Sequence, residues 1–345
     1  MINLRGLKFK NRITISPMCQ YSSKNGAPSE WHYHHLRNLI ETGAGSLVIE
    51  STAISREGRI TNKDLCLFNK KQMKEHSKLL DYLKKINNIH IILQISHSGR
   101  KGSAEVPFIK KNTSLKNKSK WQTYAPSAIR RQKDWPIPKE LSKKKILKII
   151  DSFKQTAKLA IEAGYDGIEI HMAHGYLIHQ FCSPISNKRK DEYKYEGFDF
   201  KFPTEILKKI KKIVPKNKIV GARITGTDHL KKGLKVSDSI KLVKKLKQNG
   251  LDYICVSSGG IIPKTNMKFY SGYRLKIASK IKKSCKIITR TSGLIDSKRT
   301  IRKAKVKYKL DFVALGRILV KNKYFLIKNN LVDFQTNQKQ YKYCL

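Results

Sequence analysis

Two histidines and a tyrosine at short spacing are the residues of this chain best suited to chemistry. His171 and His174 stand three residues apart, and Tyr176 follows behind Gly175. They come directly after the apolar run from Asp166 to Ile170, which has the composition of a short buried strand. Titratable groups at the end of such a strand are costly to bury unless each finds a partner. Their clustering therefore indicates a site that faces a ligand.

A regular alternation of apolar strands and amphipathic helices surrounds these residues. Strands are predicted at 13–17, 46–54, 90–95, 167–170, 218–224, 253–257, 286–289 and 312–315. Helices are predicted at 31–42, 70–86, 141–163, 203–214, 236–249, 273–283 and 296–304, and a long polar loop at 102–138. Eight strand-then-helix units without a break in composition predict a (β/α)8 TIM barrel. We expect one domain over residues 1–345, with residues 2–12 as an N-terminal hairpin lid.

A barrel places its active site where the strands end, because those loops share one face. The predicted strand ends carry small, polar or titratable residues: Met18 and Cys19, Ser51, Gln94 and His97, His171 and His174, Arg223, Ser257 and Ser258, Ser292 and Gly293, and Gly316 and Arg317. The last two strands are the usual phosphate-binding places of this fold, since glycine lets backbone N–H groups approach an anion. The sequence thus predicts one shared site at the barrel mouth.

The charge of the chain raises the question of nucleic-acid binding. With 73 Lys and Arg against 25 Asp and Glu, the formal net charge is +48. The lysines alternate with apolar residues on the predicted helices, which is typical of solvated helix faces. Zinc-finger and RNP-like motifs are missing, so we expect no specific nucleic-acid partner.

The cysteines and the N-terminus limit the class further. Six scattered cysteines without a CxxC pair argue against a zinc or iron–sulfur site and against a disulfide framework. No metal is expected at His171 and His174, because no carboxylate or third histidine has suitable spacing. The sequence shows neither the apolar run of a signal peptide nor a segment long enough to span a bilayer. We expect a soluble cytoplasmic protein without a membrane partner.

Several runs of residues together resemble the Old Yellow Enzyme family of FMN-dependent oxidoreductases, in particular its bacterial class with a cysteine beside the flavin. They are SPMCQYS at 16–22, EGRIT at 57–61, LQISHSGRK at 93–101, HMAHGYLIHQFCSPISN at 171–187, DYICVSSG at 252–259 and ALGRILV at 314–320. The matches spread over nearly the whole chain and follow one another in family order. The resemblance implies an enzyme that binds FMN, takes hydride from NAD(P)H and reduces the activated C=C bond of α,β-unsaturated carbonyl compounds.

The resemblance also implies which residues hold the flavin. Ser16, Pro17, Met18 and Cys19 would lie along it, with the Cys19 thiol tuning its potential. Ser51 would contact it through the backbone, and Gln94 would bond the pyrimidine side of the ring. Arg223 would stabilise the anionic reduced form, as a positive charge beside a developing anion does. The phosphate would be held by Gly293, Gly316 and Arg317.

On the substrate side, the resemblance assigns the residues from which we started. His171 and His174 would donate hydrogen bonds to the carbonyl oxygen of the acceptor, and Tyr176 would protonate its α-carbon. Tyr21 would contact the substrate. Lys101 matches a basic residue near the substrate, but its role does not follow from the sequence.

Two segments depart from the family pattern. Residues 191–203 read DEYKYEGFDFKFP and lack the family's glycine and Asn-Arg pairs, so the path of the 194–203 loop should differ. The chain ends Gln340-Tyr341-Lys342-Tyr343, with tyrosine where relatives carry an arginine that reaches a neighbouring subunit's site. We expect a homo-oligomer, but an arginine contact between subunits does not follow from this sequence.

Alternative interpretations stay open at this stage. A His-x-x-His pair taken alone is more often structural than catalytic, and Cys19 could be an apolar filler. Gly293 and Gly316 could be simple turns, and Ser257 could cap a helix. The same fold and flavin could serve an amine dehydrogenase or demethylase, or a dienoyl-thioester reductase. From another class, the chain could be a basic nucleic-acid-binding protein on a decayed enzyme scaffold.

Overall fold

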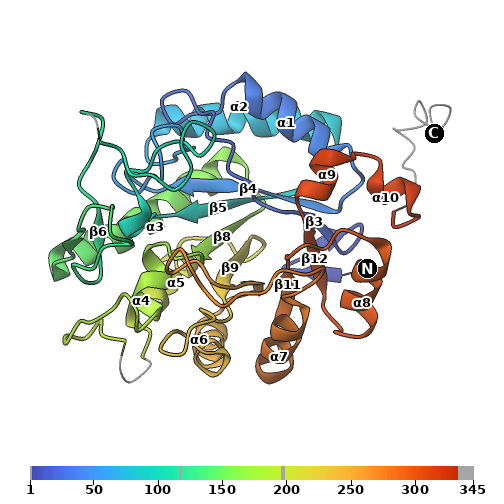
Figure 1. The fold of residues 1–345 in the computed structure, drawn as a ribbon. Helices are drawn as coiled ribbons and strands as arrows, with labels where there is room; N and C mark the ends of the chain where they lie inside the picture. Colours follow the sequence, from blue (N-terminus) through green and yellow to red (C-terminus); the bar gives the residue numbers. More distant parts are fainter. Residues whose placement is uncertain (1, 117, 196–198, 333–345) are drawn as a thin grey trace.

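Eight short runs rich in isoleucine, valine and leucine form the strands of a closed parallel barrel (Figure 1). The computed structural model describes residues 2–116, 118–195 and 199–332. The barrel strands are β3 (Ile13–Ile15), β4 (Ser46–Ala53), β5 (His90–Ser96), β8 (Gly167–Met172), β9 (Ile219–Thr225), β10 (Tyr253–Ser257), β11 (Ile288–Thr291) and β12 (Phe312–Leu315). They pair in chain order, and β12 pairs back with β3 to close the ring. The predicted (β/α)8 TIM barrel is confirmed.

Amphipathic helices surround the barrel and bury their apolar faces against the strands. The long ones are α1 (Glu30–Ile40), α2 (Lys70–Ile86), α3 (Lys143–Ala163), α5 (Lys201–Lys211), α6 (Val236–Gln248), α7 (Leu275–Cys285) and α8 (Lys298–Val306). All were predicted to within a few residues. The sequence did not predict the shorter η1 (Gly99–Lys101), α4 (Leu177–Cys182), α9 (Arg317–Lys321) and α10 (Phe325–Lys328). Within the described ranges, no helix combines the length and the apolar character needed to cross a membrane.

The predicted N-terminal hairpin is present and closes one end of the barrel. It consists of β1 (Ile2–Leu4) and β2 (Leu7–Phe9), paired antiparallel. Phe9 packs with Ile219, Tyr253 and Phe312, which stand at the starts of their strands. The hairpin therefore covers the end of the barrel opposite the strand ends that carry the candidate site residues.

A layer of charged and polar side chains lies inside the barrel above this apolar end. Glu169 is fully buried and accepts hydrogen bonds from Gln94 Nε2 (2.7 Å), from the Tyr253 hydroxyl (2.8 Å) and from the guanidinium of Arg290. Each carboxylate oxygen thus has a donor, which offsets the cost of burying its charge.

The long segment between β5 and α3 has little regular structure, as predicted. It contains β6 (Tyr124–Ala125) and β7 (Lys139–Glu140), which pair with each other and tie its end together. Three predictions fall wholly or partly outside the described residues. They concern the full domain extent to residue 345, the 340–343 tail, and the part of the 194–203 loop at 196–198.

Candidate active site

The histidine pair forms a continuous hydrogen-bonded chain at the C-terminal ends of β8 and β10. The backbone N–H of Ala173 donates to Nδ1 of His171 (3.2 Å). Nε2 of His171 lies 3.2 Å from Nδ1 of His174, and Nε2 of His174 lies 2.6 Å from Oγ of Ser257. A neutral imidazole has one donor and one acceptor. With Nδ1 of His171 accepting, both rings therefore carry their proton on Nε2.

Burial and neighbouring cations keep both imidazoles neutral. The pKa values of His171 and His174 lie well below 6.5, first because both rings are desolvated and second because of the charge of Arg223. Arg223 is the register partner of His171 on β9. Two neutral N–H donors beside a fixed positive charge can stabilise an oxygen on which negative charge develops.

Tyr176 completes this cluster. Its ring stands nearly perpendicular to that of His171, with centroids 4.8 Å apart. Burial raises the pKa of Tyr176, so the phenol keeps its proton at neutral pH. The three residues that opened the sequence analysis thus lie together, with a protonated hydroxyl beside two neutral imidazoles.

An unusual turn holds the cluster in place. His174 and Gly175 both have positive φ, +59° and +73°. The Gly175 N–H donates to Nδ1 of His179 (2.8 Å), and Nε2 of His179 lies 2.9 Å from Oδ1 of Asp228. Sequence reasoning missed His179 and Asp228, although the four-residue spacing from Gly175 to His179 is visible in the HGYLIH run.

Cys19 lies on the other side of Tyr176. Both pack against a small apolar cluster of Ile60, Ala104 and Trp135. Burial raises the pKa of the Cys19 thiol, whereas hydrogen bonds from the Ser51 backbone and the Tyr21 side chain oppose the shift. Cys19, Ser51, Tyr21 and Tyr176 are therefore neighbours.

A cavity of about 250 Å³ opens next to this cluster, between the ends of β3, β9, β11 and β12. Seven predicted cofactor residues line it: Ser16, Pro17, Met18, Arg223, Gly293, Gly316 and Arg317. Arg274, which the sequence analysis did not single out, lines it as well. Its guanidinium donates to Oγ of Ser258 (3.0 Å) and, through a longer contact, to Oγ of Ser292 (3.5 Å). Three arginines around one cavity make it a site for an anion.

The residues of this cavity fit the phosphate end and the ring edge of a flavin nucleotide. Oγ of Ser16 and Nε of Arg223 are buried without a hydrogen-bond partner among the described residues. Gly293 has φ +134°, and a Cβ on Gly316 would lie 3.1 Å from Sδ of Met18. Unpaired buried donors and a wall without side chains leave room and bonding capacity for a bound group.

Gln94 lies deeper than the other predicted cofactor residues. It does not line the cavity, and its Nε2 is bound to Glu169 (2.7 Å). This bond fixes the orientation of the amide. The carbonyl oxygen of Gln94 then remains as an acceptor that an N–H group of a bound flavin could use.

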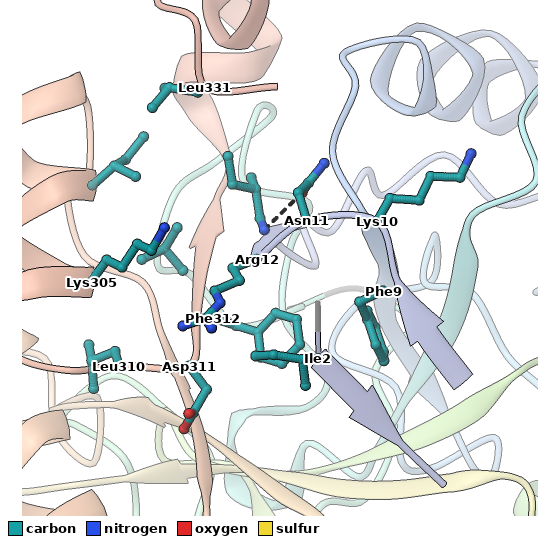
Figure 2. A pocket seen from close by; sticks show the side chains of 13 residues that line it. Ile2, Phe9, Lys10, Asn11, Arg12, Lys305, Leu310, Asp311, Phe312 and Leu331 are labelled. Atoms are coloured by element: carbon teal, nitrogen blue, oxygen red, sulfur yellow. Dashed lines mark hydrogen bonds between the residues drawn. The ribbon is translucent and has the colours of Figure 1, made fainter. Parts of the chain in front are cut away.

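A second cavity of about 260 Å³ lies at the other end of the barrel, beside the hairpin, β3, β12 and α8 (Figure 2). Its lining is largely apolar, with Lys10, Arg12 and Lys305 as its cations. Its carboxylate, Asp311, is already bound to Lys282 (2.7 Å). None of the residues predicted for chemistry lies there, so the candidate active site is at the opposite mouth.

Comparison with known proteins identifies the family of the chain. The sequence profile of the NADH:flavin oxidoreductase / NADH oxidase family matches residues 2–331. The chain is 36% identical over 341 residues to the NADPH dehydrogenase of Clostridium acetobutylicum, covering 96% of this chain and 95% of that protein. It is 35% identical over 325 residues to the NADPH dehydrogenase of Listeria innocua, covering 93% and 90%.

Solved structures share the fold at lower identity. Morphinone reductase superposes with a TM-score of 0.78 and 20% identity over 97% of this chain and 89% of its own. The Old Yellow Enzyme homologue of Zymomonas mobilis gives a TM-score of 0.79 at 20% identity, over 96% and 91%. These structures show the shared fold, and the family match together with the two bacterial relatives confirms the resemblance to the Old Yellow Enzyme family. The chain belongs to the NADH:flavin oxidoreductase / NADH oxidase family and is an FMN-dependent oxidoreductase that draws its electrons from NAD(P)H.

Proposed function

We propose that this enzyme reduces the activated C=C bond of α,β-unsaturated carbonyl compounds, with NADPH as its reductant. The observation that carries the proposal is the cluster of two neutral histidines and a protonated tyrosine at the barrel mouth, beside the three-arginine cavity. FMN, when bound, supplies the two-electron exchange with the nicotinamide and with the acceptor. The choice of NADPH rests on the names of the two bacterial relatives.

Four side chains of the chain would act on the substrate. Nε2–H groups of His171 and His174 bind the carbonyl oxygen and strengthen their bonds as negative charge grows on it. The Tyr176 hydroxyl holds the proton that the α-carbon receives. Tyr21 contacts the substrate from the side of Cys19.

The same proposal assigns the cofactor contacts. Arg317, Gly293 and Gly316, which line the cavity, would hold the phosphate, and Arg223 would supply the positive charge for the pyrimidine side of the ring. Ser16, Pro17, Met18, Cys19, Ser51 and Gln94 supply the remaining contacts. The Cys19 thiol, which burial keeps protonated, would contact the ring and adjust its potential. Cys19→Ala should shift the potential without unfolding the protein, and an unchanged potential would return Cys19 to the role of an apolar filler.

Anaerobic stopped-flow absorbance tests the proposal directly. The yellow protein should bleach with NADPH faster than with NADH and regain its colour with 2-cyclohexenone. Cyclohexene, which lacks the carbonyl, should not restore the colour. In the double variant His171→Ala with His174→Ala, FMN should stay bound while reoxidation falls by a factor of about 10² or more, as for lost oxyanion donors. Normal reoxidation in that variant would rule out the role of the pair.

Two rival functions give different outcomes in the same experiment. An amine dehydrogenase would be bleached by a methylated amine without NADPH. A thioester reductase would be reoxidised by an unsaturated acyl thioester in preference to the enone. The fold is shared with 2-naphthoyl-CoA reductase at a TM-score of 0.85 and 22% identity, but this chain spans only 51% of that protein. Colourless protein that retains RNA at physiological salt would instead support a nucleic-acid binder.

A further inference from the structure

Lys101 lies inside the candidate active site, and the sequence does not explain its role there. It ends the 3-10 helix η1, and its Nζ donates to the carbonyl oxygen of His174 (2.7 Å). A second, longer contact reaches the carbonyl oxygen of Gly260 (3.5 Å). The ammonium also lies 5.0 Å from the centre of the Tyr176 ring. Among the described residues, no carboxylate lies within ion-pair distance of it.

The two carbonyls that Lys101 contacts belong to different loops that touch backbone to backbone. A Cβ on Gly175 would lie 2.2 Å from the Gly260 carbonyl oxygen. A Cβ on Gly260 would lie 2.8 Å from Cα of His174. The turn after β8, which carries the catalytic cluster, and the loop after β10 are therefore fitted together through glycines. Gly175 and Gly260 have no side chains at this junction, so side chains from other segments, Lys101 and Gln180, bond the backbone oxygens there.

We propose that Lys101 is a positioning residue, whose ammonium group ties the turn of His174 and Tyr176 to the loop at Gly260 and so fixes where the catalytic side chains stand. A single cation serves both carbonyl oxygens, and charge-assisted bonds of this kind are stronger than neutral ones. The cation–π contact holds the face of Tyr176 from the same side. The role in catalysis rests on the proposed function, whereas the role in holding the turn does not.

We call the contacts of the Lys101 ammonium with the carbonyl oxygens of His174 and Gly260 the clamp. The strength of the clamp depends on pH because of the groups that surround the ammonium. Burial, followed by the charges of Arg131 and Arg100, lowers the pKa of Lys101 to about 7. On the side of the turn after β8, Tyr176 and the two neutral histidines face the Lys101 ammonium. On the side of the loop after β10, Gly260 contributes no charge. The ammonium form therefore predominates below pH 7, and the weaker neutral donor predominates above it.

Hydrogen–deuterium exchange of the FMN-loaded protein tests the clamp without any substrate. In Lys101→Met, amides at 173–178 and 258–262 should exchange about tenfold faster than in the wild type, since a local contact is lost. Lys101→Arg, which keeps charge and donors, should protect both segments, and Lys110→Met, on the exposed part of the next loop, should change neither. Unchanged exchange in Lys101→Met, or faster exchange spread over the whole barrel, would overturn the proposal.

A pH series on the wild type and Lys101→Arg covers the case in which Lys101→Met fails to fold. After correction for intrinsic rates, wild-type exchange at 173–178 should rise between pH 6 and pH 9, while that of Lys101→Arg should not. The reoxidation rate with 2-cyclohexenone should fall above about pH 7 in the wild type and stay level in Lys101→Arg. Parallel profiles in the two proteins would refute the clamp. A wild type that 2-cyclohexenone does not reoxidise would refute the proposed function and leave the exchange result to decide the clamp.

Discussion

His174 donates its Nε2 proton to Oγ of Ser257 across 2.6 Å. The same ring accepts from Nε2 of His171, so both Nε2 donors of the histidine pair have partners within the protein. The family resemblance has both imidazoles donating to the substrate oxygen. That oxygen must therefore displace Ser257 and the contact between the two rings. Under the proposed function, Ser257, predicted from the sequence only as a strand end or a helix cap, would compete with the substrate for His174.

Removing the competing hydroxyl should favour the ligand. In Ser257→Ala the buried N–H of His174 loses its partner in the free state, and a net hydrogen bond is worth about 1 kcal/mol. We expect a neutral carbonyl ligand such as cyclohexanone to bind the oxidised enzyme about fivefold more tightly, as measured by the perturbation of the flavin spectrum. Ser257→Thr keeps the hydroxyl and should bind like the wild type. Weaker binding in Ser257→Ala would show that Ser257 orients His174 rather than competing for it.

Arg274 should contribute to cofactor affinity as much as the predicted phosphate residues. Burial lowers its pKa to about 10, so it stays charged at neutral pH beside Arg223 and Arg317. Loss of one charge-assisted contact of about 1.5–3 kcal/mol corresponds to a dissociation constant raised roughly 10- to 100-fold. Titration of the apoprotein with FMN, followed by flavin fluorescence, should show this for Arg274→Met. Lys276→Met, two residues further on and on the exposed face of α7, is the matched control. Equal affinities would remove Arg274 from the site.

The barrel could be predicted from the sequence because each of its strands is marked by a pattern of neighbouring residues. Each strand is a run of apolar residues, and the strand ends follow from the run, so His171, Arg223 and Gly316 could be assigned to one mouth. The helix α4 escaped detection because all six of its residues are buried, which removes the amphipathic period that marks a helix.

The groups that support the site could not be predicted for a different reason. His179 meets Asp228, Lys101 meets Gly260, and Arg274 meets Ser292 across long stretches of chain. These contacts depend on loop paths, for which the sequence has no periodic signal. The family motifs included His179 and Lys101 in matching runs, but a matching run does not say which atoms meet.

The stability of the protein should fall below pH 6.5, in part because of His76. This fully buried ring accepts from the Tyr165 hydroxyl (2.7 Å) and donates to the Cys66 carbonyl (3.2 Å). Burial lowers the pKa of His76 to about 4. Between pH 6.5 and about 4, the unfolded chain binds a proton at this position that the folded chain does not bind. The free energy of unfolding therefore decreases as the pH falls, by about 1.4 kcal/mol per pH unit for this one group.

Urea denaturation at pH 7, 6 and 5 can isolate that contribution. His76→Gln keeps a donor and an acceptor but does not titrate, so its loss of stability on acidification should be smaller than that of the wild type by roughly this slope. His34→Gln, which alters an exposed ring on α1, should follow the wild type. Parallel losses for His76→Gln and the wild type would mean that other groups account for the acid sensitivity.

The turn at Gly175 should tolerate alanine less well than another left-handed glycine. Gly164, at the end of α3, has φ +102° and open space, with its nearest neighbour, Cδ1 of Leu80, 3.9 Å from an added Cβ. Gly164→Ala should therefore cost only the backbone term of about 1–2 kcal/mol. At Gly175 the added Cβ would also lie 2.2 Å from the backbone oxygen of Gly260, which cannot swing aside as a side chain would. We expect Gly175→Ala to lose about 1–3 kcal/mol more in urea denaturation, as for overpacking.

Any folded Gly175→Ala protein should also bind carbonyl ligands more weakly, because the turn moves His174, whereas Gly164→Ala should bind them normally. Equal losses of stability with normal ligand binding in both variants would show that the two loops can part without disturbing the site.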